Sequence, residues 1–265
     1  MKLYFLTYGD RNFYLSKKQL IYKAESTYLF DKCISLGPSD LNRDFKDEFY
    51  SILSQKKGGG YWIWKFKILQ NLLNEISYED IVVYCDAGST FNINKKSLNR
   101  LKEYIEILRY SKFGNLRMEC EKQFLEKQYT TKELFNYFNI KSDSDIMNSP
   151  QLQAGHLFFK KNKHSEDYLK TYEKCLKFDT NFITDAYNKN QEIYFKTNRH
   201  DQSIFSLISK IYGGEIIDNE TEFRNRKELQ YDYPFLSVRR YNHGPKDYLN
   251  YFLRRKKFLS KDYYF

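Results

Sequence analysis

The sequence predicts an α/β protein built on an open sheet with helices on both sides. Three observations carry this prediction. A short strand opens the chain at residues 3–8 and breaks at Gly9. A β-branched and aromatic run at residues 81–84 has the character of a buried strand and ends at Asp86. Amphipathic patterns at helical spacing lie between and after these runs. Open α/β sheets bind ligands beyond the carboxyl ends of their strands, so Asp86 is a candidate site residue.

Composition is that of a globular protein with a basic surface. The 265 residues are 41% hydrophobic, enough for a substantial core, and fit a single domain. Lys plus Arg minus Asp plus Glu gives 44 − 34 = +10. Such a charge favours nucleic acid, a phosphate-bearing donor or an anionic membrane face as partner. The high Tyr and Phe content is discounted, because an AT-rich genome favours the codons of both residues.

Cysteine usage and hydropathy indicate a cytoplasmic protein. The four cysteines lie far apart with no Cys-x-x-Cys pair, which predicts free thiols in a reducing compartment and argues against zinc. The apolar run after Met1 is too short for a signal peptide, and no window approaches the length of a membrane span.

The N-terminal strand ends in two candidate ligand contacts. Tyr8 is placed to stack on a base, and Asp10 to contact a ribose or base. A core tyrosine followed by an ordinary turn explains Tyr8 equally well. A helix is expected over residues 17–26 and a second strand over residues 31–36, closed by Gly-Pro.

Three glycines followed by both tryptophans form the most unusual local sequence, residues 56–65. Glycines ahead of a helix, with free amides and lysines nearby, suit a phosphate, although the P-loop pattern is absent. The alternative is a loop whose tryptophans anchor the following helix to the sheet. We expect both, with Lys65 facing a phosphate-bearing ligand.

Asp86 is followed by Ala87 and Gly88, which allow close approach to the backbone. One hypothesis is that Asp86 holds a divalent cation against a diphosphate, since hard cations prefer carboxylate oxygen. The other is that Asp86 caps the next turn.

The sequence predicts the secondary structure of some later segments and leaves that of others undefined. Helices are expected over residues 98–108 and 164–177, whereas residues 113–149 show little beyond a helix start near Thr130 or Thr131. Small residues at 153–155 lead into a strand.

Four polar residues, Arg199 to Gln202, precede a helix predicted over residues 203–211. One Asp is enough to cap a helix. Capping therefore does not explain the neighbouring Arg, His and Gln, so this corner is a candidate site. The C-terminal tail, residues 251–265, mixes cations with aromatics. That mixture suits an anionic membrane surface, and an ordinary basic helix explains it equally well.

This order of segments resembles a glycosyltransferase of the GT-A fold. It is similar to the small enzymes of bacterial capsule and lipopolysaccharide gene clusters and of some large DNA viruses, and more distantly to the family 8 retaining transferases. The resemblance implies a Rossmann-like mixed sheet, a nucleoside-diphosphate sugar as donor, and Mn²⁺ or Mg²⁺ held by an Asp-x-Asp motif. Asp86 matches the first acid of that motif, and Gly88 stands where the second would be.

The resemblance also assigns roles residue by residue. Family 8 enzymes have a strand start that contacts the sugar, and Gln153, Ala154 and Gly155 match it. They also have an Asp-Gln pair near the reacting centre, which Asp201 and Gln202 match, with His200 beside them. A late His-Gly-Pro-Lys run resembles their metal- and phosphate-binding motif. It implies His243 as a metal ligand and Lys246 as a phosphate contact.

The implied reaction is transfer of a sugar to a hydroxyl of a glycan or lipid-linked acceptor, in capsule, lipopolysaccharide or other surface-glycan synthesis. The donor-binding half is expected at about residues 1–110 and the acceptor-side half at about 111–250. Two alternatives remain: a nucleic-acid-binding protein, and an inactive relative that only binds donor or glycan. Against the first, basic residues are scattered and no RNA-binding signature appears.

Overall fold

The computed structural model describes residues 1–223, 227–238 and 244–253. The strands are β1 (Leu3–Tyr8), β2 (Lys32–Leu36), β3 (Ile81–Cys85), β4 (Thr90–Phe91), β5 (Asn115–Met118), β6 (His156–Lys160), β7 (Glu215–Ile217) and β8 (Phe235–Leu236). The longer helices are α1 (Tyr14–Ser26), α5 (Trp64–Glu75), α6 (Lys95–Tyr110), α10 (Lys163–Phe178), α11 (Asp201–Tyr212) and α12 (Pro245–Leu253). The shorter ones are α2 (Arg43–Glu48), α3 (Tyr50–Leu53), α4 (Gly58–Tyr61), α7 (Glu126–Tyr129), α8 (Lys132–Tyr137) and α9 (Asp145–Asn148), and the 3₁₀ turns are η1 (Arg11–Phe13), η2 (Pro38–Asp40), η3 (Thr180–Ile183) and η4 (Lys227–Tyr231).

A six-stranded mixed sheet forms the centre of the molecule, in the order β2-β1-β3-β6-β5-β7. β1 runs parallel to both β2 and β3, whereas β6 runs antiparallel to its neighbours β3 and β5. The predicted α/β fold with a mixed sheet is confirmed. Because β6 pairs directly with β3, the start of β6 and the end of β3 lie side by side, and this edge positions the candidate site.

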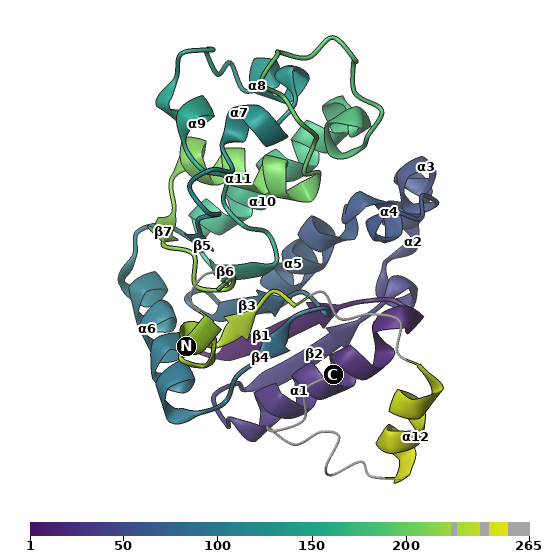
Figure 1. Cartoon of the computed structure of the whole chain (residues 1–265), viewed down its shortest axis with the longest axis vertical. Helices are drawn as coiled ribbons and strands as arrows, with labels where there is room; N and C mark the ends of the chain where they lie inside the picture. The colour runs from purple at the N-terminus through teal and green to yellow at the C-terminus, as the bar shows by residue number, and fades with distance from the viewer. Residues whose placement is uncertain (224–226, 239–243, 254–265) are drawn as a thin grey trace.

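Alternation along the strands supplies a separate core on each face of the sheet. Leu6, Val82 and Tyr84 point into one core with apolar residues of α5, α10 and α11. Phe5 and Val83 point into the other with residues of α1 and α6. In Figure 1, α10 and α11 accordingly lie above the sheet and α1 below it. Full burial of such a side chain is worth about 1.5–3 kcal/mol, so both faces stabilise the sheet.

The predicted elements are found with small changes of boundary. The strand predicted at 81–84 is β3, and the helix predicted at 98–108 is α6, which begins earlier because Asn94 accepts hydrogen bonds from the amides of Lys96 and Ser97. The helix predicted from 203 begins at Asp201. Residues 113–149, which the sequence left undefined, contain β5 and three short helices, and Thr131 caps α8.

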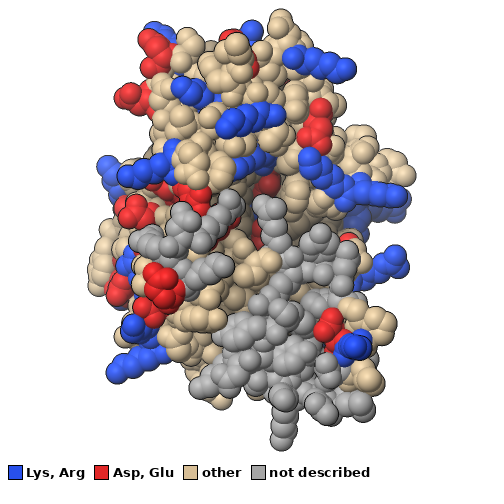
Figure 2. All heavy atoms as spheres, viewed as in Figure 1, with Lys and Arg blue, Asp and Glu red and all other residues tan. Residues whose placement is uncertain are grey.

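Surface charge is mixed on the face that Figure 2 shows, where Lys and Arg lie among acidic residues over the coloured area. Among the described residues, none of the helices is both long and apolar enough to cross a membrane. His243 and tail residues 254–265 lie outside the described residues.

Candidate functional site

Lys65 is the centre of the candidate site. Its side chain is 2% exposed, and its ammonium lies 2.7 Å from Asp201 Oδ2 and 3.2 Å from Asp86 Oδ1. It also donates a 2.9 Å hydrogen bond to the carbonyl oxygen of Ala154. One buried cation therefore joins the first turn of α5, the end of β3, the start of α11 and the segment leading into β6. These are four segments that the sequence analysis singled out.

Charges in this cluster are coupled. Burial by itself would lower the pKa of Lys65, but the carboxylates of Asp201 and Asp86 outweigh it and raise that pKa. Burial raises the pKa of Asp201 to about 6, against the opposing attraction of Lys65. At neutral pH Lys65 is thus an ammonium and Asp201 a carboxylate. Perturbed carboxyl groups of this kind are concentrated at functional sites.

Asp86 directs its side chain toward solvent and Lys65 rather than into a turn. Its side chain is 34% exposed, and the Tyr84 hydroxyl donates a 2.6 Å hydrogen bond to its Oδ1. The turn that follows uses the backbone carbonyl of Asp86 instead, which accepts from the amide of Ser89. The capping hypothesis therefore does not describe this side chain.

The segment at residues 153–155 fits against Asp86 through its small residues. The Gly155 carbonyl accepts a 2.8 Å hydrogen bond from the Asp86 amide, and a Cβ on Gly155 would lie 3.4 Å from Asp86 Oδ2. Gln153 differs from the predicted sugar contact, because its buried amide accepts from the Thr221 hydroxyl and donates to the Glu119 carbonyl.

The corner before α11 combines backbone strain with polar contacts. His200 has φ +57°, which is uncommon for a residue other than glycine, and its Nδ1 lies 2.9 Å from the Ile183 carbonyl oxygen. Asp201 follows as the first residue of α11. The Gln202 side chain is half-buried and donates a 2.8 Å hydrogen bond to Gln151 Oε1. No side-chain cap starts this helix, so capping does not explain the cluster.

One expectation at the first strand, at Tyr8, is not met, and the one at Asp10 stays a prediction. Tyr8 is buried and stacks on Trp64 with ring centroids 3.8 Å apart, so it is a core tyrosine and its face is not free for a base. Asp10 Oδ1 accepts from the Asn12 amide and caps η1. Lys65 also differs from its prediction. Its ammonium is enclosed by three protein oxygens instead of facing a phosphate.

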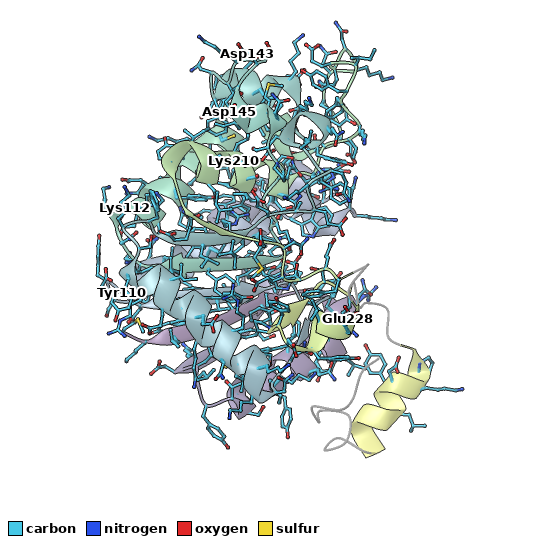
Figure 3. All side chains as sticks on the ribbon, turned by 60° about the vertical axis from the view of Figure 1, so that its left-hand side comes forward. Tyr110, Lys112, Asp143, Asp145, Lys210 and Glu228 are labelled. Atoms are coloured by element: carbon cyan, nitrogen blue, oxygen red, sulfur yellow. The ribbon has the colours of Figure 1, made fainter. Side chains whose placement is uncertain are left out.

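Lys246 is exposed on α12, which lies well apart from α11 in both ribbon views (Figures 1 and 3). The helix that carries Lys246 therefore does not adjoin α11, and the role of Lys246 as a phosphate contact stays a prediction.

The sequence contains a literal Asp-x-Asp at Asp143 and Asp145 that the sequence analysis passed over. Both side chains are exposed at the start of α9, and Figure 3 places them at the top of the molecule, away from the sheet. Ser144 between them caps that helix by accepting from the Met147 amide. This motif is a helix start and not the partner of Asp86.

Divalent metal is common in the fold class that the sequence resembles, and it requires several ligands close together. Within residues 1–223, 227–238 and 244–253, no group of three His, Cys, Asp or Glu could hold a metal ion. Asp86 contributes one carboxylate, whose Oδ1 already contacts Lys65 and Tyr84. The described residues do not fit a metal centre.

Sequence reasoning missed Tyr84 and Gln151, which orient Asp86 and Gln202. Tyr84 could have been found, because residues i and i+2 of a strand point to the same face. Gln151 had no signal beyond its closeness to residues 153–155.

No family model matches the chain, and no curated protein matches it in sequence. Its structure is similar to that of a glycosyltransferase involved in the glycosylation of the major capsid of PBCV-1. The TM-score is 0.50 at 11% identity, over 89% of this chain and 92% of that one. It is also similar to the bifunctional glycosyltransferase WbbM, with a TM-score of 0.51 at 11% identity, over 89% of this chain and 45% of that one. The chain therefore has the GT-A fold of these glycosyltransferases.

Proposed function

We propose that this protein is a glycosyltransferase that moves a sugar from a nucleoside-diphosphate sugar to a hydroxyl of a glycan or lipid-linked acceptor. The observation that carries the proposal is the buried Lys65 ammonium, 3.2 Å from Asp86 and 2.7 Å from Asp201. It joins an acid at the carboxyl end of a central strand to an acid at a helix start, at the edge where open α/β sheets bind ligands. The GT-A fold supports the same reaction class.

In this proposal, Asp86 lies at the donor and Asp201 at the reacting carbon. Asp86 is the more exposed acid, and Gly155 leaves space beside its Oδ2. Asp201 is ionised at neutral pH, because its pKa of about 6 lies below pH 7. An ionised carboxylate can orient an acceptor hydroxyl or accept its proton. Gln202, the next residue of α11, is held by its hydrogen bond to Gln151 Oε1 and is proposed to support the sugar.

The proposal keeps Lys65 as a positioning residue. With its three contacts occupied, it fixes both carboxylates and partly offsets their charge. We derive no step through Mn²⁺ or Mg²⁺, since the described residues do not build a site for either. His243 as a metal ligand and Lys246 as a phosphate contact remain hypotheses from the resemblance. Action in capsule, lipopolysaccharide or other surface-glycan synthesis, at the inner face of a membrane, is likewise part of the proposal.

Two alternatives predict different results. A nucleic-acid-binding protein would use a continuous basic stripe, whereas Figure 2 shows mixed charge on the visible face. An inactive relative would bind donor or glycan without turnover, and the missing second acid at Gly88 motivates it.

A thermal-shift screen against UDP-, GDP-, CDP- and dTDP-sugars, with EDTA or with Mn²⁺, identifies the donor, because ligand binding raises the midpoint. Nucleotide release then measures hydrolysis and transfer. We expect Asp86→Asn and Asp201→Asn each to lower turnover by at least about 100-fold, the lower range for a general base. Asp143→Asn, in the literal but remote Asp-x-Asp, is the matched control and should be unchanged. Wild-type turnover in either site variant removes that residue from the mechanism. Salt-sensitive oligonucleotide binding without any donor binding refutes the function.

A further inference from the structure

The glycine turn before α5 is an unusual piece of backbone. Five consecutive residues have positive φ: Gly58 (+58°), Gly59 (+59°), Gly60 (+95°), Tyr61 (+53°) and Trp62 (+60°). A Cβ on Gly58 would lie 2.5 Å from the Trp62 ring, so the turn folds that ring over a glycine. Positive φ at two aromatic residues is strained and persists only where the surroundings impose it.

This turn does not form the phosphate-binding loop that the sequence suggested. Each amide from residue 59 to 63 donates to a carbonyl within the turn itself, and Trp64 Nε1 donates to the Gly58 carbonyl. Amides turned inward in this way do not point toward an anion. Of the two lysines before the turn, Lys57 is also neutralised, because it pairs with Asp185 at 2.8 Å.

The turn instead places aromatic rings beside the residues that lead into Asp201. The Tyr61 and Trp62 rings lie 5.0 and 5.6 Å from the His200 ring, centroid to centroid. Tyr61 and Trp62 are both half-buried, so each keeps part of its surface in solvent. His200 directly precedes Asp201, and Trp62 lies one helical turn before Lys65, so these rings adjoin the Lys65 cluster.

Polar groups for hydroxyl recognition border the rings. Asp185 accepts from Lys57 and from the Tyr61 hydroxyl at 3.3 Å, and its other oxygen lies 3.7 Å from His200 Nε2. Lys57 and Asp185 are each partly exposed, at 47% and 41% of the side chain. A charge-balanced pair offers both donors and acceptors and disfavours a phosphate.

We propose that Tyr61 and Trp62, packed against the buried His200 ring, form the acceptor subsite with the Lys57–Asp185 pair and bind a neutral sugar ring. A pyranose has an apolar C–H face and a rim of hydroxyls, which match aromatic surface bordered by a few polar groups. This inference rests on the proposed function for the word acceptor, whereas binding of a sugar can be tested without any reaction.

Intrinsic fluorescence tests the binding directly. The chain has two tryptophans, and Trp64 is buried, so a ligand at the surface reports mainly through Trp62. The probes are methyl glycosides of glucose, galactose, mannose, xylose and N-acetylglucosamine. We expect a saturable change with at least one of them, abolished in Trp62→Phe and retained in Tyr50→Ala, an exposed tyrosine of α3 used as control. The absence of a saturable change with every glycoside overturns the inference.

Kinetics then assign the subsite to the acceptor. With the donor found by thermal shift, we expect Trp62→Ala to raise the KM for the glycoside at least tenfold, whereas the control Tyr50→Ala keeps both this KM and donor hydrolysis at the wild-type level. Trp62→Phe, which keeps a ring, should restore most of the loss. An equal fall in hydrolysis and transfer shows a structural role and overturns the assignment. If glycosides bind but no nucleotide sugar binds or is hydrolysed, the sugar site stands and the proposed function fails.

Discussion

Replacing Lys65 with Met removes the charge at the centre of the site while keeping a long side chain. The variant leaves Asp86, Asp201 and the Ala154 carbonyl without their shared cation. Removing one partner of a buried ion pair costs about 3–5 kcal/mol. For a chain of this size, each 1 kcal/mol shifts the midpoint by roughly 2–4 °C, so we expect a fall of roughly 6–20 °C.

The stability lost in Lys65→Met, called the deficit below, should increase with pH. The folded pKa of Asp201, about 6, lies above the unfolded value of about 3.9, so the folded state binds more protons between them. Stability linked to Asp201 is therefore present below about pH 4 and is lost as pH rises through 6. Without the Lys65 ammonium the folded pKa rises further. The difference in the free energy of unfolding between the variant and the wild type, called the gap below, should be small near pH 4.5 and largest above pH 7.

Urea unfolding followed by circular dichroism at pH 4.5, 6 and 8 measures this gap. The double variant Lys65→Met/Asp201→Asn is the control, because it removes the uncompensated charge together with the cation, and at pH 8 it should recover a large part of the loss. A deficit that is the same at all three pH values, or no deficit at pH 8, refutes the reasoning.

Three further expectations concern other parts of the chain. Burial lowers the pKa of His156 to about 4, and neither ring nitrogen has a hydrogen-bond partner among the described residues. Since an unfolded histidine binds a proton below about pH 6.5, stability should fall between pH 6.5 and 4, by up to ~3 kcal/mol. His156→Phe should remove this acid sensitivity in thermal melts, and an unchanged pH profile contradicts the assignment. Gly60→Ala should lower the midpoint more than Gly59→Ala, because its Cβ would lie 2.7 Å from Leu53 Cα whereas that of Gly59 meets nothing nearer than 3.7 Å. Donor-free protein should bind Mn²⁺ more weakly than about 1 mM in an EPR titration, since a lone carboxylate is a poor site. A tighter site lost in Asp86→Asn or His243→Ala contradicts this.

Much of the fold could be predicted because its signals are local. The strand ending at Asp86 is a run of β-branched and aromatic residues, and α6 and α10 show helical spacing with capping residues at their starts. The segment 113–149 resisted prediction for a physical reason. Its strand β5 has four residues, including the fully buried Asn115 and Arg117, and each of its helices spans six residues or fewer. Such elements are fixed by tertiary contacts rather than by periodicity.

The two acids of the candidate site could be predicted from the sequence, whereas the burial of its cation could not. Asp86 and Asp201 stand out because each follows a recognisable change in pattern, from strand to turn and from loop to helix. Lys65 was expected to face a phosphate-bearing ligand, whereas it is buried, as lysines rarely are unless paired. Its two partners come from distant parts of the chain, so no local window contains the reason for its burial. The same holds for the glycine turn, where the amides of residues 59 to 63 looked free in sequence and donate within the turn in the fold.

Stability alone does not account for the Lys65 cluster. A buried ion pair is often no more stable than apolar residues of similar volume, because desolvation offsets the attraction between the charges. Here two carboxylates share one ammonium, so a negative charge remains, and the pKa of Asp201 stays raised to about 6. An apolar side chain at Lys65 and a neutral one at Asp201 would fill the same space without that cost. One acid of the pair is also left partly open to solvent, at the edge of the sheet where ligands bind. The charged cluster is costly to keep, is open on one side and is fixed by four separate segments. These three features support the proposal that a reaction takes place at its open side.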